Sequence, residues 1–121
     1  MNPSRLSAEL DSLIQECGVY PYKFFNVLHH SENPNLDLTK QNEIWQDIKD
    51  EEWHDLKLEN YSLWAITDNG DLVWWNEKQT IAMNPRAQEY MALPVNPKQF
   101  IRLIGLGKVT GIFPSALWTH A

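Results

Sequence analysis

The chain has 121 residues, 43% of them hydrophobic and 21% charged, and its formal net charge at pH 7 is −6. These values are typical of one globular domain spanning residues 1–121, and the lack of clustered basic residues argues against direct binding of nucleic acid. No apolar run reaches the length of a membrane span, and the first residues lack the apolar core of a secretory signal. A single cysteine excludes an internal disulfide. We therefore expect a cytoplasmic protein that does not enter membranes.

A first helix is predicted at the N-terminal end of the sequence. Asn2 can cap its start, Pro3 suits its first position, and Gly18 follows its end. Apolar residues recur at helical spacing and form one stripe: Leu6, Leu10, Leu13, Ile14 and Cys17. We therefore expect these side chains, including the thiol of Cys17, to pack in the core.

The next apolar segment, Tyr20–Leu28, has no clear period. It could form a short helix after Pro21 or a buried strand, and the helix is slightly favoured. After a polar loop at residues 29–35, Thr39 is expected to cap a helix over about Lys40–Lys57. The inner side of this helix carries Ile44, Trp45, Ile48 and Leu56.

Residues 63–83 predict a three-stranded antiparallel meander. Strand-forming runs at Leu63–Thr67 and Leu72–Trp75 flank a turn that contains Asn69-Gly70, and a second turn leads into a strand at residues 79–83. An Asn-Gly pair favours a two-residue type I′ turn, which fixes the register of the flanking strands. The expected pairs are Asp68 with Asp71, Ile66 with Val73, and Trp64 with Trp75.

Beyond the meander, Asn84-Pro85-Arg86 predicts a turn, and residues 86–93 could form either a short helix or an edge strand. Asn96-Pro97 repeats the start signal of a helix, and Gly105 and Gly107 mark its end. Its apolar residues predict burial: Phe100, Ile101, Leu103 and Ile104. The order of elements predicts an α+β fold, in which an antiparallel sheet meander packs against N-terminal and C-terminal helices.

Nothing in the sequence assembles a catalytic site or a cofactor site, so we expect a non-catalytic protein with no cofactor. Glu51 and His54 have metal-ligand spacing on one helix face, but the di-metal bundles that use this motif need a second copy and further carboxylates. The cluster of His29, His30 and Glu32 matches no specific metal site. A metal-dependent enzyme built on these residues is the least favoured interpretation.

The turn at residues 68–71 also carries two carboxylates. Asp68 and Asp71 are expected to be exposed at the tip of a hairpin. An exposed tip cannot desolvate a carboxylate pair enough to separate the two pKa values, as general acid–base catalysis requires. Turn chemistry accounts for both residues.

Acidic residues are concentrated in the N-terminal half of the sequence. Residues 1–60 carry 12 acidic and 5 basic side chains, and residues 43–59 hold seven of these carboxylates. A solvated helix face is the simplest interpretation, but an acidic surface that exposes an aromatic side chain is typical of protein recognition. We expect a basic protein partner to bind through Asp47, Asp50, Glu51, Glu52, Trp53 and Asp55. Trp74 is a further candidate, on a sheet face that could be left uncovered.

The C-terminal half resembles the SUKH superfamily. The resemblance rests on the strand Leu63–Thr67, the turn and aromatic strand at Gly70–Trp75, and the helix at Pro97–Leu103. It covers about residues 60–113, whereas the Asn-Gly-Gly turn typical of the family's N-terminal half is not present here.

This resemblance implies an α+β, non-catalytic binding protein. Many bacterial members are immunity proteins that neutralise toxins, often nucleases, delivered between competing cells, and others are regulatory or scaffold proteins. The acidic N-terminal half agrees with the first role, because the substrate groove of a nuclease is basic. An immunity protein that binds a basic toxin domain is therefore the leading functional hypothesis, and a regulatory or scaffold protein with several weak partners is the alternative.

Overall fold

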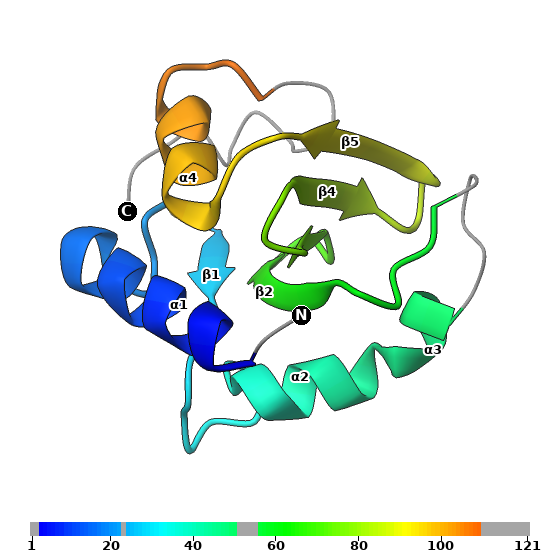
Figure 1. Cartoon of the computed structure of the whole chain (residues 1–121), viewed down its shortest axis with the longest axis horizontal. Coiled ribbons are helices and arrows are strands. Elements are labelled where there is room, and N and C mark those ends of the chain that lie inside the picture. The colour runs from blue at the N-terminus through cyan, green and yellow to red at the C-terminus, as the bar shows by residue number, and fades with distance from the viewer. Residues whose placement is uncertain (1–2, 23, 51–55, 110–121) are drawn as a thin grey trace.

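The computed structural model describes residues 3–22, 24–50 and 56–109. These residues form an α+β fold, as predicted, in which helices precede and follow an antiparallel sheet (Figure 1). In chain order the elements are α1 (Pro3–Cys17), β1 (Phe25–Val27), α2 (Leu38–Ile44), α3 (Gln46–Asp50), β2 (Ser62–Thr67), β3 (Leu72–Trp75), β4 (Thr80–Asn84), β5 (Glu89–Leu93) and α4 (Pro97–Gly105). No helix in these ranges is long and apolar enough to cross a membrane.

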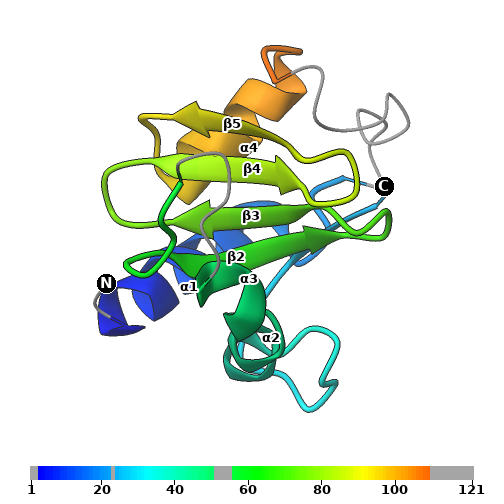
Figure 2. The ribbon, with the colours of Figure 1, turned by 90° about the vertical axis from the view of Figure 1, so that its right-hand side faces the viewer.

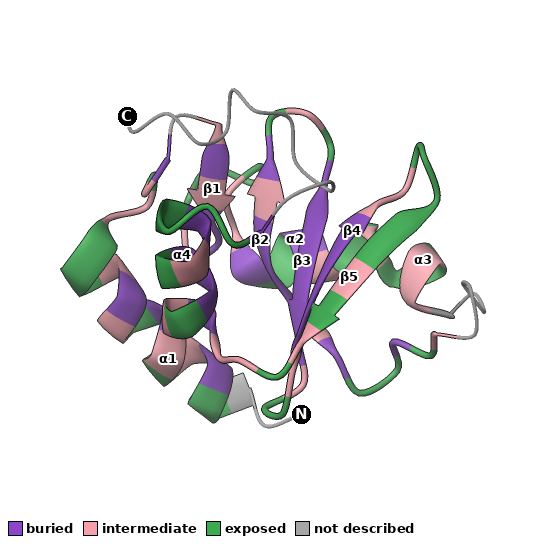
Figure 3. Cartoon of the chain, turned by 90° about the horizontal axis from the view of Figure 1, so that it is seen from above, coloured by how far each residue is buried: buried purple, intermediate pink, exposed green. Residues whose placement is uncertain are grey.

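The five strands form one sheet in the order β1-β2-β3-β4-β5, with each neighbouring pair antiparallel. Helices α1 and α4 lie on the same face of this sheet, and α2 runs beside β2 (Figure 2). All four residues of β3 are buried, whereas β5 at the sheet edge is partly exposed (Figure 3). Since successive side chains of a strand point to opposite faces, both faces of the sheet are covered at its centre.

The hairpin between β2 and β3 has a three-residue loop. The amide of Thr67 donates to the carbonyl of Asp71 at 3.0 Å, and the amide of Gly70 donates to the carbonyl of Thr67 at 3.0 Å. Among residues 68–71, only Gly70 has a positive φ, at 89°. A type I turn followed by a left-handed glycine has this geometry, so the predicted type I′ turn at Asn69-Gly70 is wrong.

The longer loop changes the register of the two strands. The observed pairs are Ser62 with Trp75, Leu63 with Trp74, Ala65 with Val73, and Ile66 with Leu72. Relative to the predicted pairs, the register is shifted by one residue next to the turn and by two residues beyond Trp64, so the predicted pairs are wrong. Trp64 is the extra residue of a β-bulge, and its ring packs 5.9 Å from that of Phe100 on α4.

Helix α1 has the predicted bounds and the predicted glycine after its end. Gly18 has φ 81°, and its amide donates to the carbonyl of Ile14 at 2.8 Å. The apolar stripe is buried at Leu6, Leu10 and Leu13. Cys17, however, is exposed as the last residue of the helix. The predicted burial of this thiol is wrong.

Two further expectations for the N-terminal half are corrected. The segment around Phe25–Val27 is a strand that pairs with β2, so the slightly favoured helix is wrong and the alternative strand is present. Helix α2 is capped by Asp37 rather than Thr39, since the Asp37 carboxylate accepts from the amides of Lys40 and Ser31, each at 3.0 Å. These bonds, first that from Lys40, lower the pKa of Asp37.

The C-terminal elements agree with the sequence. Residues 89–93 form an edge strand, one of the two predicted alternatives. Helix α4 begins with a capping box, in which the Asn96 side chain accepts from the amide of Gln99 and the Gln99 side chain accepts from the amide of Asn96. At its end, Gly107 has φ 71° and its amide donates to the carbonyl of Ile104 at 3.0 Å.

Candidate functional site

Helix α2 is anchored to the sheet by one side-chain amide. The Asn42 Oδ1 atom accepts from the amide of Leu63 at 2.8 Å, and Asn42 Nδ2 donates to the carbonyl of Leu63 at 3.0 Å. Strand β1 pairs only with residues 65–67 of β2, so it does not reach Leu63. The Asn42 side chain thus takes the place of a neighbouring strand and satisfies backbone groups that would otherwise be unpaired.

A second anchor fixes the rotation of the helix about its axis. Gln41 is buried, its Nε2 donates to the carbonyl of Pro34 at 2.9 Å, and its Oε1 accepts from the indole nitrogen of Trp45 at 3.2 Å. The inward-facing residues of α2 and α3 are therefore Leu38, Gln41, Trp45 and Ile48. Trp45 caps the end of α2, and the predicted continuous helix is broken at this residue.

The same rotation turns three neighbouring residues towards solvent. Glu43 and Asp47 are exposed, and Ile44 between them has 51% of its surface exposed. The sequence predicted Ile44 on the inner side of the helix, and this prediction is wrong because Gln41 and Trp45 set the buried stripe. The acidic surface, defined here as Glu43, Ile44 and Asp47, thus combines an apolar side chain with two carboxylates.

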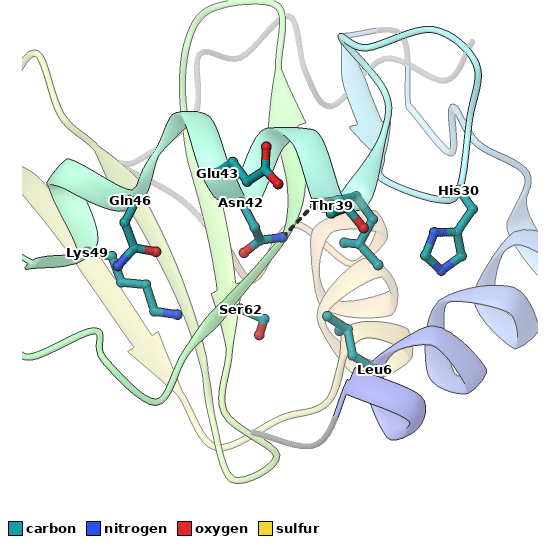
Figure 4. Close-up of a pocket in the computed structure, with 9 residues that line it drawn as sticks. Leu6, His30, Thr39, Asn42, Glu43, Gln46, Lys49 and Ser62 are labelled. Carbon is teal, nitrogen blue, oxygen red and sulfur yellow. Dashed lines mark hydrogen bonds between the residues drawn. The ribbon is translucent and has the colours of Figure 1, made fainter.

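A groove of about 390 Å³ runs beside the acidic surface. Gln46 and Lys49 lie at one end and His30 at the other, with Asn42 and Ser62 between them (Figure 4). The remaining lining residues are Leu6, Leu38, Thr39 and Glu43. Glu43 therefore belongs both to the groove and to the acidic surface, so a partner bound to one would reach the other.

One pair at the groove has the residue types of a nucleophile and its base. Ser7 Oγ lies 3.4 Å from His30 Nε2, in an exposed position. An activated nucleophile needs a shorter contact of about 2.6–3.2 Å and a third group that orients the base. This pair gives no support to a catalytic role.

The two carboxylates of the β2–β3 turn differ in their exposure to solvent. Asp68 is exposed, but the side chain of Asp71 is fully buried, which corrects the expectation that both are exposed. Asp71 Oδ2 accepts from the Thr67 hydroxyl at 2.9 Å, and Asp71 Oδ1 lies 3.8 Å from the guanidinium of Arg86. Burial raises the pKa of Asp71, while the Thr67 hydrogen bond and the Arg86 charge act in the opposite direction.

The predicted partner-binding residues have different outcomes. Asp47 is exposed on α3, as a binding role requires. Asp50 ends α3, and nothing is described of its side chain. Glu51, Glu52, Trp53 and Asp55, together with His54 of the metal hypothesis, lie outside the described residues. Trp74 is fully buried, so the prediction that it forms part of a partner surface is wrong.

The other metal hypothesis concerned the loop after β1. Within residues 3–22, 24–50 and 56–109, no group of three histidine, cysteine or acidic side chains is placed to hold a metal ion. His29 is half-buried, with Nδ1 3.2 Å from the carbonyl of Val27, and His30 lies near Ser7. The two histidines therefore have separate surroundings.

Sequence reasoning missed the contribution of Glu43 and Ile44. Their exposure depends on Gln41, a polar residue that is buried because two hydrogen bonds satisfy its amide. The sequence did contain a signal for this orientation of the helix. Gln41, Trp45 and Ile48 have helical spacing, and they form a buried stripe if a polar residue is accepted as one of its members.

Comparisons of the chain with protein-family models, with curated proteins and with solved structures gave no match.

Proposed function

We propose that this chain is a non-catalytic protein-binding domain that acts in the cytoplasm as an immunity protein of SUKH type, with a basic toxin domain as its partner. The observation that carries the proposal is the acidic surface, where the half-exposed Ile44 lies between the carboxylates of Glu43 and Asp47. The resemblance of residues 60–113 to the SUKH superfamily supports the choice of partner.

The two kinds of side chain have separate roles in such an interface. An apolar side chain that becomes fully desolvated contributes most of the affinity, because a few buried anchors dominate binding energies. Carboxylates at the rim attract a basic partner and raise the rate of association, an effect that salt screens. Ile44 is the anchor in this proposal, and Glu43 and Asp47 supply the attraction.

The anchor also has a rigid support. Asn42 holds α2 to the backbone of Leu63, and Gln41 fixes the helix rotation through Pro34 and Trp45. A surface held in its binding conformation loses less entropy on association than a mobile one.

The first test is capture of partners on the purified protein at low and at physiological salt. One stoichiometric basic protein that remains bound at physiological salt is expected. Several weak partners would instead favour the alternative, a regulatory or scaffold protein. The identified partner is then used to measure rates and affinities.

Charge reversal tests the site. Glu43→Lys combined with Asp47→Lys should slow association at least tenfold at low salt, and Ile44→Ala should mainly speed dissociation. Asp11→Lys combined with Glu32→Lys, at two exposed acidic positions that do not belong to the acidic surface, is the matched control and should change the affinity far less. Equal losses of affinity in the two double variants would show that only the net charge of the protein matters. Unchanged affinity in the Glu43→Lys and Asp47→Lys double variant would place the interface elsewhere.

A further inference from the structure

A second hollow lies on a different part of the molecule, where β1, the loop before α2 and the end of β2 meet. Its volume is about 320 Å³. The lining residues are Tyr20, Asn26, Asn33, Asn35, Leu36, Gln41, Ile66, Thr67 and Asp68. None of these residues belongs to the acidic surface.

The composition of this lining restricts the ligand. The lining contains four side-chain amides and one carboxylate, and among these described residues there is no lysine, arginine or histidine. Among these described lining residues a phosphate or another anion would meet the Asp68 carboxylate and no cation, so anionic ligands are disfavoured. Amides both donate and accept hydrogen bonds, as do the hydroxyl groups of a neutral polyol.

Three of the amides are already held in place, and one of them is Gln41, which bonds to Pro34 and Trp45. Asn26 Nδ2 donates to the carbonyl of Ile66 at 3.1 Å and to Asp68 Oδ1 at 2.9 Å. Asn33 Oδ1 accepts from the amide of Asn35 at 3.0 Å. Fixed side chains lose little conformational entropy when a ligand binds, so these polar groups are preorganised.

An aromatic ring stands at the same hollow. Tyr20 has 52% of its surface exposed, which is high for a large hydrophobic residue. Ile66 and Leu36 add half-buried apolar surface beside it. An exposed aromatic face can pack against the C–H face of a saturated ring, while the amides bind that ring's hydroxyl groups.

We propose that the hollow formed by Tyr20, Asn26, Asn33, Asn35 and Asp68 binds a neutral pyranose sugar. The face of the sugar ring packs on Tyr20, and vicinal hydroxyl groups exchange hydrogen bonds with the asparagine amides and with Asp68. The volume lies at the low end of ligand pockets, about 300–1,000 Å³, and therefore suits one ring. A ligand with so few atoms binds weakly, with dissociation constants on the order of 1–10 mM. The site is independent of the proposed protein partner.

The test is a titration of the uniformly ¹⁵N-labelled full chain, followed by two-dimensional NMR. The probes are glucose, galactose, mannose and N-acetylglucosamine, with glycerol as an acyclic polyol and a blocked triglycine as an amide ligand. At least one sugar should give saturable shifts at the backbone amides of Asn33, Asn35 and Asp68 and at the side-chain amide of Asn26. A tetrasaccharide of the best sugar that binds more tightly would identify a glycan chain as the source, and equal affinity would identify the free sugar.

Variants test the contact between Tyr20 and the sugar ring separately from the hydrogen bonds of the asparagine amides. Tyr20→Ala should weaken binding of the best sugar at least tenfold, whereas Tyr20→Trp should retain it. Tyr90→Ala, at another tyrosine with an exposed side chain, is the matched control and should leave the affinity unchanged. Asn35→Ala should weaken binding severalfold.

Four results would overturn the sugar site. In the titration these are shifts that no sugar saturates, shifts at residues away from the hollow, and glycerol or triglycine that binds as tightly as the best sugar. In the variants it is a Tyr20→Ala chain that binds the best sugar as tightly as the original chain does.

Discussion

At the scale of single residues, Asp71 is the least expected group in the molecule. Its side chain is fully buried, and within the part of the chain that the structure describes its Oδ1 atom has no hydrogen-bond partner. The nearest cation, Arg86, is 3.8 Å away and largely exposed, so it offsets only part of the cost of burying a charge. Burial therefore raises the pKa of Asp71 in the folded chain above its value in the unfolded chain.

The raised pKa of Asp71 sets the sign of a pH effect. Between the unfolded and folded pKa values, the folded chain binds more protons than the unfolded chain, so stability falls as the pH rises through this window. Asp71→Asn should be more stable than the original chain at pH 8, by about 1 kcal/mol, and should lose this advantage near pH 4. Denaturant unfolding at both pH values measures the difference.

A matched substitution controls for loss of a carboxylate at this turn. Asp68→Asn removes the neighbouring exposed carboxylate and measures the effect of losing a carboxylate at this turn without burial. A constant advantage of Asp71→Asn across the pH range would contradict the argument, because it would show that packing rather than ionisation decides the effect.

At the scale of elements, the β2–β3 hairpin shows how one turn determines a sheet register. In a type I′ turn both Asn69 and Gly70 would need positive φ, whereas here only Gly70 has it. In the part of the chain that the structure describes, no atom outside Gly70 and its two chain neighbours lies within 4 Å of where a Gly70 Cβ would be, so the cost of a side chain there is conformational rather than steric.

These facts predict different outcomes at the two turn positions. Gly70→Ala should destabilise the protein by about 1 kcal/mol, because alanine disfavours the left-handed conformation, and Gly70→Asn should cost less. Asn69→Ala should be nearly neutral, since the Asn69 backbone is not left-handed. Thermal or denaturant unfolding of the three variants checks this. Equal destabilisation by Asn69→Ala and Gly70→Ala would favour the type I′ turn instead.

At the scale of the whole molecule, a cluster of charges joins the first helix to the last. Glu16 on α1 lies 3.2 Å from Lys98 Nζ and 3.2 Å from Arg102 Nη2, both on α4. The hydrogen bond from Lys98, followed by that from Arg102, lowers the pKa of Glu16. Because this group is at the surface, salt screens the attraction.

The lowered pKa of Glu16 gives a pH effect of the opposite sign to that of Asp71. The stabilisation is fully present above the ordinary pKa of the carboxyl group, near 4.5, and is lost as the pH falls through the lower folded value. Glu16→Gln should lower the melting temperature at neutral pH and low salt by no more than a few degrees, and the difference should shrink at high salt and at low pH. Glu9→Gln, elsewhere on α1, is the control for the loss of one carboxylate from this helix.

Much of the fold followed from local signals. The capping box at Asn96 and Gln99, the glycine after α1 and the strand-forming runs around the turn are set by neighbours within a few residues, so the α+β class and most element positions could be predicted. The exposed carboxylate of Asp47 followed from charge alone.

The tertiary structure decided the features that depend on distant contacts. The rotation of α2, and with it the exposure of Ile44, depends on hydrogen bonds from Gln41 to Pro34 and from Asn42 to Leu63. The burial of Trp74 and Asp71 depends on elements that cover the sheet. Sequence by itself determined where most helices and strands lie, because capping, turns and periodicity act locally, but it did not identify strand β1 or the break at Trp45. Only the tertiary structure determined the exposure of Ile44 and Cys17 and the burial of Trp74 and Asp71, because buried hydrogen bonds and packing join residues far apart in the chain.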